Sequence, residues 1–241
     1  MNGSNIAIIL VLASAGNSYA LQSSPVPPAE SLSSELARIR KEQAPSFERS
    51  LQEEQLLYYL GQQTDGKDQK KKMYEEGLKL AEQSRNQKPD DPDAILWWTA
   101  HEGSLAEINK GASGLNAVTK IEAALLTLKK THPEYGHAAA DRVLGRLYQK
   151  APSFISIGSS RRAEEHLRGA LAKFPTYPGN QVFLADFLAE EGKKEEASRL
   201  ALSALRSPEL QSYPRDAHDW KQMAMSVLQR TGVKVPKELT N

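Results

Sequence analysis

The chain has 241 residues, a formal net charge of +1 at pH 7 and no cysteine. A charge this close to zero gives no bulk signal for a protein that binds nucleic acid or a membrane surface. The lack of cysteine excludes thiolate metal sites, disulfides and a lipid-modified cysteine at a signal cleavage site. The length suits one large domain, two small domains or one extended solenoid.

The first 20 residues are predicted to be a signal peptide. The apolar run from Ile6 to Ala15 is too short to cross a hydrocarbon core of about 30 Å as a helix. Small residues at Ser18 and Ala20 fit cleavage after Ala20, although no lysine or arginine precedes the apolar run. We therefore expect a periplasmic or secreted protein with no stable membrane insertion after the leader is removed.

Residues 21–44 are expected to form a linker rich in proline and serine, followed by a first helical segment from about Ser34. Residues 45–231 are predicted to be one helical domain, and residues 232–241 a polar tail. Within the domain, Lys110–Gly114 is predicted to be a loop, with helix resuming near Val118. A last helix, Arg215–Arg230, is expected to cap the domain.

A repeat of 34 residues organises the second half of the chain. Small and large apolar residues recur at this spacing, because 197 − 163, 201 − 167 and 204 − 170 each equal 34. The first copy also carries an L-G-x-x-Y segment from Leu144 to Tyr148, and each copy ends at a proline, Pro175 or Pro208. This pattern is typical of the tetratricopeptide (TPR) repeat.

The predicted fold is therefore all-α, a TPR-like solenoid of about four helical hairpins plus a C-terminal capping helix. A single hairpin cannot bury its own apolar face, so successive hairpins stack to form a continuous core. No alternating pattern of strand type occurs at any length.

One segment departs from the repeat. Tyr148 and Ala163 are 15 residues apart, whereas the corresponding Leu188 and Ala197 are 9 apart, and 15 − 9 leaves six extra residues. They fall within residues 151–158, which include three large apolar residues: Phe154, Ile155 and Ile157. Such a loop should be covered or should contact a partner.

Five short motifs follow one another here: L-G-x-x-Y-x-x-A-P from Leu144, S-I-G from Ser156, A-x-x-H-L-x-x-A-L from Ala163, F-P-x-Y-P-x-N from Phe174 and L-A-x-F-L from Leu184. With the tryptophan pair upstream, they make the chain resemble the TatT-like family, the T component of tripartite ATP-independent periplasmic (TRAP) transporters. The resemblance covers roughly residues 45–230. It implies a periplasmic helical protein that forms a homo-oligomer such as a trimer, associates with a solute-binding protein and offers a hydrophobic ligand a path.

Partner-binding candidates come from the helix register. The first helix of each TPR hairpin lines the concave face, which places Arg142, Arg146, Gln149 and Asp186 on it. We expect Arg142 and Arg146 to receive an acidic group of a protein partner, since a guanidinium binds carboxylates in a bidentate way. The alternative is an arginine pair that is merely solvated or salt-bridged.

Catalysis finds little support, and neither a metal nor a cofactor is expected. His137 and Asp141 lie four residues apart and are predicted to form a surface hydrogen bond. A second hypothesis for function is a ligand carrier with an apolar channel, whose candidate lining residues are Trp97, Trp98, Phe154 and Ile157. The alternative for the two tryptophans is partial burial between helices.

Overall fold

The computed structural model describes residues 28–109, 111–236 and 239. The predicted signal peptide and the start of the linker lie outside these residues. The described residues form ten α-helices and one short 3-10 helix, η1: α1 Ala29–Glu42, α2 Phe47–Gln63, α3 Lys67–Gln87, α4 Pro92–Asn109, α5 Gly111–Thr131, α6 Tyr135–Lys150, α7 Ser160–Lys173, α8 Pro178–Glu190, α9 Lys194–Arg206, η1 Pro208–Ser212 and α10 Pro214–Thr231.

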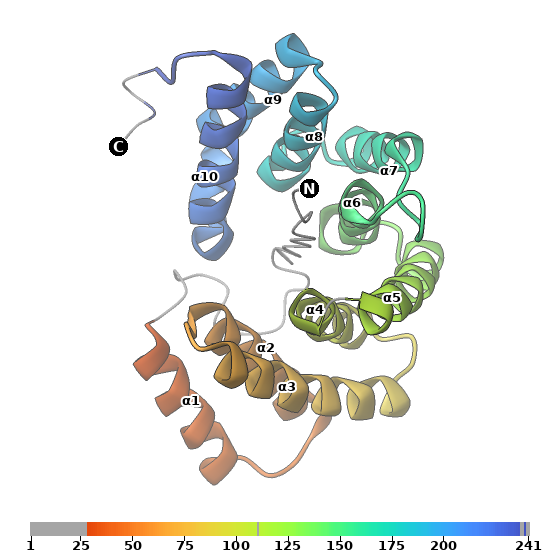
Figure 1. The fold of residues 1–241 in the computed structure, drawn as a ribbon. Helices are drawn as coiled ribbons and strands as arrows, with labels where there is room; N and C mark the ends of the chain where they lie inside the picture. Colours follow the sequence, from red (N-terminus) through yellow and green to blue (C-terminus); the bar gives the residue numbers. More distant parts are fainter. Residues whose placement is uncertain (1–27, 110, 237–238, 240–241) are drawn as a thin grey trace.

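Consecutive helices pack as antiparallel hairpins, α2 with α3, α4 with α5, α6 with α7 and α8 with α9. Helix α10 packs on both α8 and α9 and closes the stack. In Figure 1 the hairpins follow one another around an arc, with α4 and α6 on its inner side and α5 and α7 on its outer side. The predicted all-α solenoid of about four hairpins with a capping helix is confirmed.

The repeat corresponds to a close contact between the two helices of one hairpin. A Cβ atom placed on Gly145 of α6 would lie 2.5 Å from Cγ of Leu167 and 3.2 Å from the carbonyl oxygen of Ala163, both on α7. Ala163 and Leu167 are themselves buried. Since contacts this short leave no room for a methyl group, the glycine lets the two backbones approach.

The six extra residues lie in the connection between α6 and α7. This connection spans residues 151–159, nine residues, whereas residues 191–193 join α8 to α9, and 9 − 3 gives the predicted six. The base of the loop is tightly closed, because a Cβ on Gly158 would lie 1.9 Å from the carbonyl oxygen of Ala151. Phe154 and Ile155 are exposed at the tip, while Ile157 packs partly buried against the core.

Helix α5 begins earlier than predicted. Helix resumes at Gly111, which has a φ of 68°, rather than near Val118. A Cβ on Gly114 would lie 3.1 Å from the carbonyl oxygen of Ala106. Glycines that suggested a loop instead allow a left-handed turn and a close helix crossing.

Both ends of the described chain are also more ordered than the sequence suggested. Helix α1 starts at Ala29 and packs Leu32, Leu36 and Ile39 into a small core with leucines of α2. After α10, Val233 and Val235 rest partly buried against the main core. None of the described helices combines the length and the apolar character that crossing a membrane requires.

Replacing Gly145 with alanine tests the close contact within the hairpin. We expect Gly145→Ala to lower the free energy of unfolding by about 1–2 kcal/mol. Overpacking lowers the free energy of unfolding by about 1–3 kcal/mol, whereas replacing a glycine inside a helix with alanine raises it by up to about 1 kcal/mol. Urea denaturation measures the change. Gly169→Ala is the matched control, because Gly169 lies inside α7 and its added Cβ would lie 4.0 Å from the nearest neighbour atom. An equal effect of both variants would contradict the packing account.

Candidate functional site

Six polar side chains gather where α6, α8 and α10 end. We call this group the Asp186 cluster; it consists of Arg146, Gln149 and Lys150 of α6, Asp186 and Glu190 of α8, and Arg230 of α10. The α6 residues share one helix face because they are three and four positions apart, as do the two acids of α8. The cluster therefore joins three helices that are far apart in sequence.

Asp186 is the centre of the cluster. Its Oδ2 atom accepts hydrogen bonds from Arg146 and, at 3.2 Å, from the Gln149 amide. Its other oxygen accepts one from Arg230. Glu190 adds a second layer, since it accepts hydrogen bonds from Lys150 and, at 2.8 Å, from Gln149.

The electrostatics keep this buried carboxylate ionised. Burial alone would raise the pKa of Asp186, but the charges of Arg146, Lys150 and Arg230 outweigh burial and lower it. Nearby on α4, burial raises the pKa of Glu107 to about 7, against the opposing effect of Arg146. Three cations and two anions leave the cluster itself with a net charge of 3 − 2 = +1.

Burial divides the cluster into an inner and an outer part. The side chains of Arg146 and Asp186 are almost fully enclosed. Lys150, Arg230 and Glu190 keep 20%, 35% and 38% of their side-chain surface exposed. A partner would therefore meet the outer three first.

Arg142 lies elsewhere than its predicted position on the concave surface. It is fully buried, and its guanidinium donates to the carbonyl oxygens of Gly136 and His137 and, at 2.9 Å, to Asn180. The backbone of Gly136, His137 and Ala138 has φ angles of 57°, 56° and 60°, which makes a left-handed turn inside α6. Arg142 thus holds this costly turn in place, and of the two predicted arginines only Arg146 belongs to the cluster.

The same turn explains why the predicted surface hydrogen bond between His137 and Asp141 is wrong. The left-handed turn directs His137 onto the ring of Tyr177, with the ring centroids 4.2 Å apart. Asp141 is buried and is held at 2.8 Å by each of His166, Lys129 and Lys173. This second carboxylate ties α5, α6 and α7 together.

The four predicted channel residues are not brought together. Trp97 is partly buried against Tyr58, with ring centroids 5.8 Å apart, whereas Trp98 is buried beneath Arg85. Phe154 lies at the exposed loop tip, and Ile157 packs on the core.

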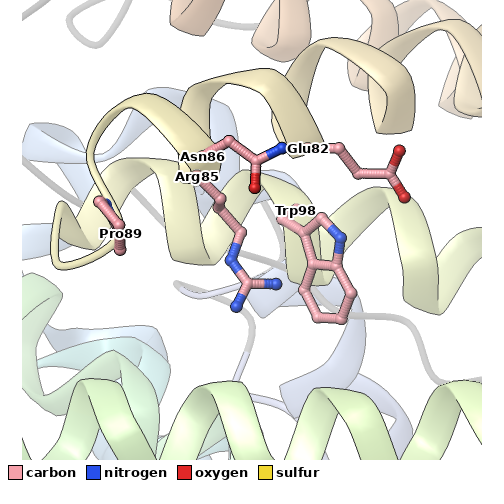
Figure 2. Close-up of a pocket in the computed structure, with 5 residues that line it drawn as sticks. All are labelled: Glu82, Arg85, Asn86, Pro89 and Trp98. Carbon is pink, nitrogen blue, oxygen red and sulfur yellow. The ribbon is translucent and has the colours of Figure 1, made fainter.

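Trp98 lines a pocket that has a volume of about 560 Å³. Its other lining residues are Glu82, Arg85, Asn86 and Pro89 (Figure 2). We call it the Trp98 pocket. Its walls are largely polar, so it differs from the apolar channel that the ligand-carrier hypothesis requires.

Sequence reasoning missed Lys150, Glu190 and Arg230. The first two could have been found, since each lies four residues after a predicted site residue on the same helix. Arg230 carried no such signal, because only the packing of α10 on α8 brings it to Asp186. Arg85 was missed for a similar reason, since its position depends on how α3 crosses α4.

Comparison with known proteins finds similarity among solved structures. No family model matches the chain, and neither does any curated protein. Among solved structures, the chain is similar to that of a thermophilic TPR protein from Thermus thermophilus, with 20% identity and a TM-score of 0.44. The alignment covers 76% of this chain and 100% of that one. Membership of the TatT-like family therefore stays a prediction.

Removing the central carboxylate should destabilise the stack. We expect Asp186→Ala to lower the free energy of unfolding at pH 7 by about 3 kcal/mol or more, because Arg146 is left buried without its partner. Glu190→Ala, which removes a partly exposed acid, should cost about 1 kcal/mol or less. Guanidinium denaturation compares the two.

The loss of stability caused by Asp186→Ala should also depend on pH. Because the folded pKa of Asp186 is lowered, its stabilisation is present above the unfolded value of about 3.8 and is lost as the pH falls through the folded pKa. The gap between wild type and Asp186→Ala should narrow below about pH 3.8. A gap that is constant or that widens with acid would contradict the ion-pair account.

Proposed function

We propose that this chain is a non-catalytic TPR-like scaffold that binds a protein partner through the outer part of the Asp186 cluster. The observation that carries the proposal is the set of three partly exposed charges, on α6, α8 and α10, above an enclosed Arg146–Asp186 pair. Charges fixed from behind by a buried network lose little side-chain freedom on binding, which favours recognition.

The chemistry of the outer charges favours an acidic partner segment. An incoming carboxylate would pair with Lys150 and Arg230, replacing Glu190 as the acceptor for Lys150. Arginine adds bidentate geometry to that contact. The incoming carboxylate would not replace Asp186, because Arg146 and Gln149 enclose Asp186.

A finer proposal concerns the setting. We propose that the protein is exported, that it acts as an accessory subunit of a TRAP-type transport system, and that its partner is a periplasmic solute-binding protein. The support is the leader-like segment of residues 1–20 and the motifs between Leu144 and Leu188 that resemble the TatT-like family. A homo-oligomer is part of what the resemblance implies.

The second candidate is still a ligand carrier, but one for a ligand with a polar group, because the Trp98 pocket is not the apolar channel of the original hypothesis. Three of its five lining residues, Glu82, Arg85 and Asn86, have polar or charged side chains. This lining suits a ligand with a polar group better than a purely hydrophobic one.

Affinity capture tests the scaffold proposal. The tagged full chain, purified from its own cells, should bring down a solute-binding protein that mass spectrometry identifies. The double variant Lys150→Ala/Arg230→Ala should weaken binding of that purified protein by about tenfold or more, because two charge contacts are lost.

The matched control removes the same total charge elsewhere. Arg161 and Lys194 are exposed residues of α7 and α9 outside the cluster, and Arg161→Ala/Lys194→Ala should bind like wild type. Equal binding by both double variants, or equal losses in both, would refute a role for the cluster. Circular dichroism should show the same helix content in all three proteins.

Export is tested separately. Cells that express the chain should release it on osmotic shock, and N-terminal sequencing should begin at Leu21. Recovery of the full-length chain with Met1 in the cytosolic fraction would contradict the proposed setting and leave the binding proposal to its own test.

A further inference from the structure

The Trp98 pocket is built from two adjacent helices and the turn between them. Glu82, Arg85 and Asn86 come from the last turns of α3, Pro89 from the connection, and Trp98 from α4. Its volume of about 560 Å³ lies in the range of sites that bind small molecules, about 300–1,000 Å³.

Arg85 is the distinctive group in this pocket. Its guanidinium carbon lies over the indole of Trp98, 4.3 Å from the ring centroid. Within the described part of the chain, no side chain or carbonyl oxygen accepts a hydrogen bond from it. Its half-buried N–H groups are therefore available to a ligand in the pocket.

Other partly buried arginines of the described chain donate to carboxylates instead. Arg168 donates to both oxygens of Glu196 and to Glu164, and Arg49 donates to Glu53. In Arg85 the contact with Trp98 takes the place of such pairs. A guanidinium fixed against an aromatic ring keeps its five donors in one plane, the geometry that suits a carboxylate.

The remaining wall limits the charge of the ligand. Glu82 is the only acid among the five lining residues, and in Figure 2 its carboxylate turns to the opposite side of the indole from Arg85. The lining carries one cation, Arg85, and one anion, Glu82. Arg85 can pair with one carboxylate of the ligand, whereas a second negative charge would find no cation in the lining and would be repelled by Glu82. The Asn86 amide adds one further polar contact.

We propose that the Trp98 pocket binds a small organic monocarboxylate, whose carboxylate accepts hydrogen bonds from Arg85 above Trp98. The site is independent of the Asp186 cluster, since none of its lining residues belongs to the cluster. The carboxylate head would lie at Arg85 and the organic part in the rest of the pocket.

Isothermal titration calorimetry with benzoate as the probe tests the site on the full chain. Wild type should bind benzoate saturably, and Arg85→Gln should bind it about tenfold more weakly or worse, because hydrogen bonds to a charged group are lost. Benzamide, which has the same shape without the charge, should bind no better to wild type than benzoate does to Arg85→Gln. Arg161→Gln, which alters an exposed arginine far along the chain, should leave benzoate binding unchanged.

A second variant tests the charge limit without touching Arg85. Glu82→Gln should strengthen binding of the dianion phthalate about threefold or more, while benzoate gains less. Absence of saturable benzoate binding at millimolar concentrations, equal affinity of wild type and Arg85→Gln, or equal affinity for benzoate and benzamide would each overturn the proposal.

Discussion

The structure depends on the close approach of the two helices in each hairpin. In the α6–α7 hairpin, Gly145 of α6 leaves the space into which Leu167 of α7 packs, against the backbone at Ala163. Stacking of the hairpins joins their apolar faces into a main core whose buried residues run from Tyr58 to Leu228. Polar groups are brought together as a consequence of this packing.

The Asp186 cluster is one group of polar side chains that this helix packing brings together at the surface. Once α6, α8 and α10 are packed side by side, Arg146 and Asp186 are enclosed and must pair, because an isolated buried charge is costly. Lys150, Glu190 and Arg230 lie above this pair with part of their surface exposed. The Trp98 pocket arises in the same way, where α3 and α4 cross and Arg85 meets an indole in place of a carboxylate.

Local sequence pattern was enough to predict the hairpins, and the six-residue insertion between α6 and α7 could be counted from the repeat alone. Prediction from the sequence pattern failed where the backbone conformation departs from that of a helix. The left-handed turn at Gly136–Ala138 separated His137 from Asp141 and buried Arg142. Partners such as Arg230 and Arg85 depend on packing between helices, which periodicity within one helix does not specify.

Hydrogen–deuterium exchange on the chain, alone and with its captured partner, tests the central claim most directly. The account predicts that binding slows amide exchange in the C-terminal turns of α6, α8 and α10, which carry Lys150, Glu190 and Arg230. Protection confined to residues 151–158, where Phe154 and Ile155 are exposed, with no change at those three helix ends, would contradict it.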